Sequence, residues 1–138
     1  MHRIRGGVCL PGSCSAVLFT SLAFLFYAPS WNSYFVSDDY EFLGRVALAG
    51  AARYWRESWG YGNEYRPLLV YTYALNAVWS GANPAGYDLF NTALHVANGL
   101  LLMWCASRLG IERRTAWLAA VFFLLNPVGH ESVLWISG

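Results

Sequence analysis

The stretch LFNTALHVANGLLLMWCAS, residues 89–107, carries no charged side chain, and it has about the 20 residues that a helix needs to cross a bilayer. The rest of the chain has the same character. Its 138 residues are 57% hydrophobic and 17% aromatic but only 12% charged, whereas charged residues make up about 25% of an ordinary soluble domain. The composition therefore predicts an all-α membrane protein. A formal net charge of +1, without any polybasic tract, gives no reason to expect nucleic acid as a partner.

A second uncharged apolar stretch, VCLPGSCSAVLFTSLAFLFYA, covers residues 8–28 and follows Arg3 and Arg5. A cleaved signal peptide has the same layout of a basic start and an apolar middle. However, no convincing cleavage site between small residues follows, and Trp31 suits the aromatic belt where a span leaves the membrane. We therefore favour a retained first transmembrane helix at residues 15–29.

The sequence predicts two more spans, at residues 87–108 and in residues 115–138, joined by a short turn at residues 109–114. Pro127 interrupts the last segment, so its end is expected to begin the next outer loop. Residues 30–86 then form a long loop, rich in tyrosine and tryptophan, between the first and second spans.

This loop contains two apolar segments that we interpret as interfacial helices, because they are too short or too often interrupted by charge to span. The first segment, PLLVYTYALNAVW, follows Arg66 and begins with a proline, which suits the first turn of a helix. The second, EFLGRVALAGAARYWRES, has apolar residues at helical spacing with arginines between them. The expected helices cover about residues 66–80 and 41–58.

The arginines decide which side of the membrane the loop faces. Three spans place the arginines of residues 1–14 and of residues 108–114 on one side, which is cytoplasmic by the positive-inside rule. A fourth span at residues 67–79 would export the second group, so we prefer three. The loop of residues 30–86 is then extracytoplasmic.

Two adjacent aspartates, Asp38 and Asp39, stand in that loop within the stretch SYFVSDDYEFLGR. In one interpretation, Asp38 caps the following helix, with Glu41 three residues later in a D-x-x-E variant of the capping box. In the other, one of the two carboxylates is a general base that accepts a proton from a reacting group. The sequence leaves both interpretations open.

The second predicted span carries four polar side chains at spacings of three, four and three, which places them on one face of a helix. Such residues usually face the interior of a helical bundle or a wet cavity. They serve either in hydrogen bonds between helices, which are common for asparagine and histidine, or directly in chemistry. The four residues are Asp88, Asn91, His95 and Asn98.

Further polar residues lie on the same outer side in this topology. Arg66 is either a surface arginine that reaches the lipid headgroups or an anion clamp, since a helix N-terminus and a guanidinium group both suit a phosphate. His130 and Glu131 follow the proline break, but two adjacent residues do not have the spacing of metal ligands. We therefore predict no cofactor, and a divalent metal has no support in the sequence.

Four motifs in this order resemble the N-terminal part of the GT-C membrane glycosyltransferases, and most closely the O-mannosyltransferase-like proteins that carry tetratricopeptide repeats. The resemblance covers roughly residues 15–138. The last motif departs from the family pattern, because Asn126 stands where a histidine is usual. The motifs are FVSDDYEFL, YRPLLVYTYALN, NPAGYDLFNTALHVANGLLL and NPVGHESVLWISG.

The resemblance implies a multi-span enzyme that moves a sugar from a polyprenyl-phosphate-linked donor to a hydroxyl group of a protein or glycan acceptor. It assigns the base to Asp38, with Asp39 as its neighbour in the acidic motif. It also implies that Arg66 contacts the donor phosphate, and we group His130 and Glu131 with it as candidate donor-binding residues.

The resemblance covers only about the first quarter of such an enzyme, so we expect the chain to be an N-terminal fragment of a glycosyltransferase. The alternative is a small noncatalytic membrane protein, a remnant or subunit derived from the same fold. Besides the donor and acceptor, membrane lipid is the expected partner. The expected location is the bacterial inner membrane, with the loop of residues 30–86 outside.

Overall fold

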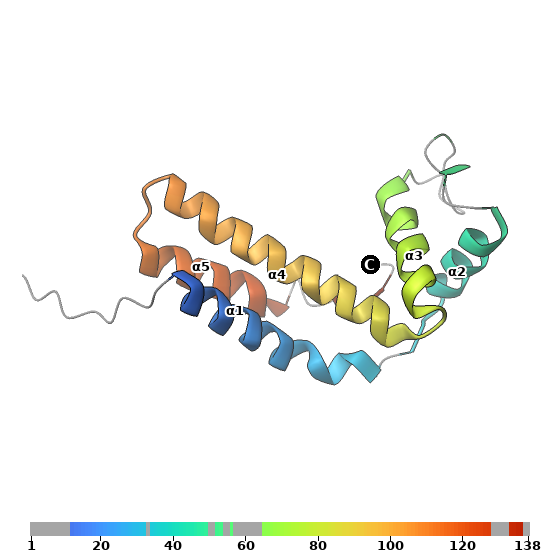
Figure 1. The fold of residues 1–138 in the computed structure, drawn as a ribbon, viewed down its shortest axis with the longest axis horizontal. Coiled ribbons are helices and arrows are strands. Elements are labelled where there is room, and N and C mark those ends of the chain that lie inside the picture. Colours follow the sequence, from blue (N-terminus) through green and yellow to red (C-terminus); the bar gives the residue numbers. More distant parts are fainter. Residues whose placement is uncertain are drawn as a thin grey trace, which may run out of the picture.

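The computed structural model describes residues 12–32, 34–49, 52–53, 56, 65–127 and 133–136. This part of the chain is predominantly helical and contains no strand, which confirms the predicted all-α class for these residues. Helices α1, α4 and α5 lie side by side as a bundle, and α2 and α3 stand at the end of the bundle where α4 begins (Figure 1). The helices are α1 (Gly12–Tyr27), the 3-10 helix η1 (Ala28–Asn32), α2 (Asp38–Ala49), α3 (Pro67–Ser80), α4 (Pro84–Arg108) and α5 (Arg113–Leu125).

Helix α4 is the one helix in the described ranges that is both long and apolar enough to cross a membrane. It has 25 residues, which correspond to roughly 37 Å at 1.5 Å per residue. The side chain of Asn83 accepts a hydrogen bond from the amide of Ala85 at 3.1 Å, and Pro84 occupies the first turn. Because both features favour a helix start, α4 begins at Pro84, three residues before the predicted span of residues 87–108.

The apolar helices beside α4 are shorter than a helix that crosses a bilayer, which needs about 20 residues. Helix α5 has 13 residues, or about 20 Å against a hydrocarbon core of about 30 Å. It ends because Asn126 precedes Pro127 and takes an extended conformation, with φ −65° and ψ 120°. The apolar helical segment Ala16–Trp31, which covers most of α1 and continues into η1, is also too short to count as a candidate span. Length and composition therefore identify one candidate span in the described residues, and the other two predicted spans stay predictions.

The bundle is packed around a small apolar core that joins α1, α4 and α5. The core consists of Phe19, Ala23, Val96, Ala120 and Leu124. Close approach of α1 to α4 depends on a glycine, since a Cβ atom at Gly99 would lie 2.4 Å from Cζ of Phe19. The carbonyl oxygen of Leu124 on α5 also lies 3.0 Å from the hydroxyl of Tyr27 on α1 and 3.2 Å from Nε2 of His95 on α4.

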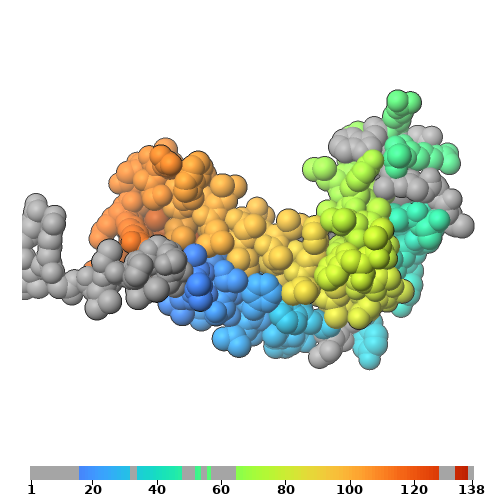
Figure 2. Space-filling view, in the orientation of Figure 1, coloured from blue at the N-terminus to red at the C-terminus, as the bar shows by residue number. Residues whose placement is uncertain are grey.

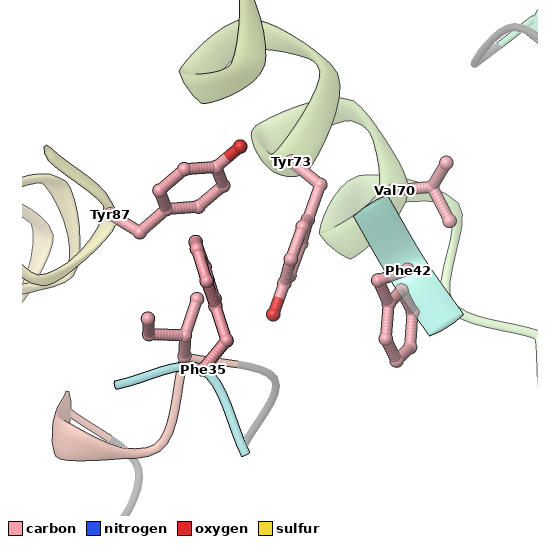
Figure 3. Packing of buried hydrophobic residues seen from close by; sticks show 6 residues of the cluster. Phe35, Phe42, Val70, Tyr73 and Tyr87 are labelled. Atoms are coloured by element: carbon pink, nitrogen blue, oxygen red, sulfur yellow. The ribbon is translucent and has the colours of Figure 1, made fainter. Parts of the chain in front are cut away.

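A second, aromatic core joins α2, α3 and the first turn of α4, at the end of the bundle. It consists of Phe35, Phe42, Val70, Tyr73, Tyr87 and Ile136 (Figure 3). The turn between α3 and α4 is tight: Gly81 has a φ of +60°, and its carbonyl accepts a hydrogen bond from the hydroxyl of Tyr87 at 3.0 Å. Because of this turn, α3 stands out from the end of the bundle in the space-filling view (Figure 2).

Candidate functional site

The acidic pair lies at the start of α2, and a compact turn precedes it. The amide of Asp39 donates to the carbonyl of Val36 at 3.0 Å, and the amide of Val36 donates to Oδ2 of Asp39 at 2.9 Å. Between them, Ser37 has a φ of +43°, a conformation that residues other than glycine seldom adopt. Asp39 therefore closes this turn from both sides, through its backbone and its side chain.

This geometry corrects the capping interpretation. The predicted cap paired Asp38 with Glu41, but the carboxyl group that reaches back to a free amide is that of Asp39. Glu41 instead forms an ion pair with Arg45 one turn later. The helix starts at Asp38, earlier than the predicted start at about residue 41. The side chain that bonds back to a backbone amide is that of Asp39, two residues before the predicted Glu41.

The two aspartates have different environments. Asp39 is 1% exposed, and its Oδ1 accepts a hydrogen bond of 2.6 Å from the hydroxyl of Tyr73 on α3. Asp38 is exposed, and its Oδ1 lies 3.1 Å from the hydroxyl of Ser37. Of the two carboxyl groups, that of Asp38 is the one that a molecule in the surroundings can reach.

Tyr73 connects the acidic turn to the aromatic core. Figure 3 shows its ring between those of Phe42 and Tyr87. The ring of Tyr73 is stacked on Phe42 at a centroid distance of 5.1 Å, and the centroid of Tyr87 is 5.4 Å away. The ring is thereby fixed on two sides, so the direction of its hydroxyl group is fixed as well.

Arg66 lies immediately before α3, with Pro67 in the first turn of the helix. Its side chain is exposed, and its carbonyl oxygen accepts the amide of Val70 at 3.3 Å. Tyr73 is seven residues further on, about two helical turns into α3, and lies on the same buried side of the helix as Val70. Arg66 and the acidic pair thus belong to the two helices that pack against each other, α3 and α2, and Tyr73 joins α3 to Asp39.

The polar residues of α4 do not form one continuous exposed face. Asp88 and His95 are buried, Asn91 is half-buried and Asn98 is exposed. The contact of His95 with the Leu124 carbonyl agrees with the interpretation of hydrogen bonds between helices. Its ring also stacks on Phe123 with a centroid distance of 4.8 Å.

The remaining candidate residues, His130 and Glu131, lie outside the described residues. Among the residues that are described, no three histidine, cysteine or acidic side chains are grouped as a metal site would require. Sequence reasoning missed Tyr73. Its spacing from Val70 marks the buried side of α3, but nothing in the sequence links its hydroxyl to an aspartate 34 residues earlier.

No protein-family model matches the chain, and no solved structure matches it. Curated relatives do. Protein O-mannosyl-transferase TMTC1 of Homo sapiens is 30% identical over 97% of this chain and 17% of its own length. Protein O-mannosyl-transferase Tmtc1 of Drosophila melanogaster is 30% identical over 86% of this chain and 15% of its own length. Protein O-mannosyl-transferase TMTC3 of Mus musculus is 37% identical over 54% of this chain and 8% of its own length.

The chain therefore spans less than a fifth of the length of each of these relatives. All three are animal proteins, so they give no support to the expected bacterial inner membrane. They do confirm the resemblance that the four motifs predict. Over almost its whole length, this chain is related to a segment of the protein O-mannosyl-transferases of the TMTC type.

Proposed function

We propose that this chain is part of an integral membrane glycosyltransferase of the GT-C type. In this proposal the enzyme transfers a sugar from a polyprenyl-phosphate-linked donor to a hydroxyl group of an acceptor. The names of the relatives suggest mannose as the sugar and a protein as the acceptor. The observation that carries the proposal is the exposed Asp38 beside a buried, fixed Asp39, in a chain related to these transferases.

In the proposed reaction, Asp38 is the general base. The acceptor oxygen forms a bond to the anomeric carbon of the sugar while the bond from that carbon to the phosphate oxygen breaks. The polyprenyl phosphate leaves with the electron pair, and Asp38 takes the hydroxyl proton. Because the acceptor attacks directly, one carboxylate suffices and no covalent sugar–enzyme intermediate is needed.

Arg66 is proposed to bind the donor phosphate. It precedes the N-terminus of α3, where backbone amides and the helix dipole favour an anion, and its guanidinium group can donate two parallel hydrogen bonds to phosphate oxygens. His130 and Glu131 remain proposed donor-binding residues on the strength of the motif alone.

The proposed topology keeps three membrane segments, at residues 15–29, 87–108 and 115–138, with α2 and α3 outside. Large apolar side chains support a lipid- or helix-covered bundle, since Leu25 on α1 and Phe122 on α5 are each 73% exposed. The turn with Arg113 and Arg114 lies at the far end of α4 from α2 and α3 (Figure 1). This separation supports an arginine-rich cytoplasmic side and a catalytic outer side.

The test is a transfer assay on membranes that contain the complete reading frame to which this chain belongs. Radiolabelled polyprenyl-phosphate mannose is the donor, and a peptide rich in serine and threonine is the acceptor. Asp38→Asn keeps the size of the side chain and removes the base, so transfer should fall ~10²-fold or more at equal membrane yield. The control is Glu112→Gln, an exposed acid at the opposite end of α4, which should transfer at the wild-type rate.

A noncatalytic protein would give no transfer above the level of membranes without the chain. An Asp38→Asn variant with wild-type transfer would show that Asp38 is not the base. The first result would overturn the proposed transferase activity. The second would overturn the assignment of Asp38 as the catalytic base.

A further inference from the structure

Tyr73 carries a buried hydroxyl group that the proposed reaction does not use. The side chain is 1% exposed, and its hydroxyl donates to Oδ1 of Asp39 at 2.6 Å. Both groups lie between α2 and α3, so this hydrogen bond joins the two helices that carry the candidate site. A short bond to a buried carboxyl group is one of the stronger hydrogen bonds in proteins.

The other oxygen of the same carboxyl group holds the turn before α2. Oδ2 of Asp39 accepts the amide of Val36, and Ser37 is kept at a positive φ between them. Asp38 directly follows this strained residue. Because a non-glycine residue leaves such a conformation unless its surroundings maintain it, the position of Asp38 depends on the bonds made by Asp39.

Helix α3 connects this turn to Arg66. The helix begins directly after Arg66, and Tyr73 lies about two turns further along it, on the same buried side as Val70. A helix of this length is stiff, so the hydroxyl of Tyr73 sets the acidic turn at a fixed distance from the proposed phosphate-binding residue. Such alignment matters because small misplacement of reacting groups costs large factors in rate.

We propose that Tyr73 is a positioning residue for sugar transfer. Its hydroxyl holds Asp39 against α3, and Asp39 in turn holds the turn that places Asp38 at the start of α2. Tyr73 does not contact the substrate in this arrangement. The inference rests on the proposed function, in which Asp38 is the base and Arg66 binds the donor phosphate.

The test uses Tyr73→Phe, which removes the hydroxyl group and keeps the ring in the aromatic core. With polyprenyl-phosphate mannose as the probe, we expect kcat to fall roughly tenfold or more, because the base is less well placed. KM for the donor should stay within about twofold, since donor contacts are not removed. The matched control is Tyr40→Phe, which removes a hydroxyl group from an exposed tyrosine next to Asp39 and should keep the wild-type kcat.

A double-mutant cycle with Asp39→Ala, which removes the acceptor of the Tyr73 hydroxyl, separates positioning from other roles. If Tyr73 acts through Asp39, the double variant should be no slower than the slower single variant. Losses in kcat that multiply would mean that Tyr73 acts independently of Asp39, and would overturn the proposal. Membrane yield and thermal unfolding are measured for every variant, so that a fall in kcat is read only from folded protein.

The Asp38→Asn variant distinguishes a failure of the positioning role of Tyr73 from a failure of the proposed function. If Asp38→Asn abolishes transfer while Tyr73→Phe keeps the wild-type kcat, the positioning role is wrong and the proposed function stands. If Asp38→Asn transfers normally, the proposed function fails and the positioning role fails with it. Should Tyr73→Phe not accumulate in membranes, Asp39→Ala removes the same bond from its other side, and an unchanged kcat there would overturn the proposal.

Discussion

Gly99 on α4 lies directly against the ring of Phe19 on α1. A Cβ atom at Gly99 would be 2.4 Å from Cζ and 2.9 Å from Cε1 of that ring, well inside normal contact distance. Phe19 is fully buried in the core of the bundle, so its ring has no open space to move into. The absence of a side chain at Gly99 therefore sets how closely α1 approaches α4.

Gly99→Ala should lower the thermal unfolding midpoint of the detergent-solubilised chain. The added methyl group overpacks the core, at a cost of about 1–3 kcal/mol, which exceeds the helix-propensity gain of about 1 kcal/mol from replacing glycine. Gly44→Ala on α2 is the matched control, because no atom lies within 4 Å of its added Cβ, and it should raise the midpoint. Equal shifts for the two variants would contradict the packing argument.

The sequence predicts where the helices lie better than where they end. Apolar content and an Arg-Pro start place α3 within a residue of its observed bounds. The Asn-Pro pair at residues 83–84 is compatible with two structures, because such a pair occurs both in turns after a helix and at the start of a helix. The structure uses it to start α4. A second Asn-Pro pair, at residues 126–127, ends α5. The sequence predicts a longer membrane segment there, in residues 115–138.

The candidate site is less predictable for a different reason. Successive residues of a helix point about 100° apart, so one of two adjacent aspartates can be buried while its neighbour is exposed. Which of them is buried depends on Tyr73, 34 residues away in the chain. Sequence reasoning finds the acidic pair and Arg66, but only the packing of α3 on α2 distinguishes Asp39 as the fixed member and Asp38 as the exposed one.

Tyr27→Phe should weaken the bundle slightly, whereas the double variant with His95→Phe should weaken it by more than the sum of the single changes. The Leu124 carbonyl is near the end of α5, where carbonyl groups lack partners within the helix, and it meets both side chains. One such bond between membrane helices contributes about 0.6 kcal/mol. Thermal unfolding measures the effect, with Tyr34→Phe, at an 84% exposed tyrosine, as a silent control. Strict additivity would show that the two side chains do not share this carbonyl.

The proposed topology predicts which side of the membrane each end of α4 faces. In a background with its cysteines replaced by serine, Tyr34→Cys should react with a membrane-impermeant thiol reagent in intact cells, because the loop is extracytoplasmic. Glu112→Cys, also exposed but beside the arginine-rich turn, should react only after the cells are lysed. The reverse pattern would place Asp38 in the cytoplasm and invert the topology.

Arg66→Ala should raise the KM for polyprenyl-phosphate mannose about tenfold or more, since a hydrogen-bonded charge pair with phosphate is among the stronger polar contacts. Arg66→Lys should recover only part of the loss, because an ammonium group lacks the planar fork that binds two phosphate oxygens at once. Arg45→Ala on α2 is the control, as the charge of Arg45 is already paired with Glu41. The donor must be varied at saturating acceptor, so that the change is assigned to donor binding. A wild-type KM in Arg66→Ala would show that Arg66 does not bind the donor. Equal KM values for Arg66→Lys and the wild type would indicate a simple charge effect in place of a bidentate contact.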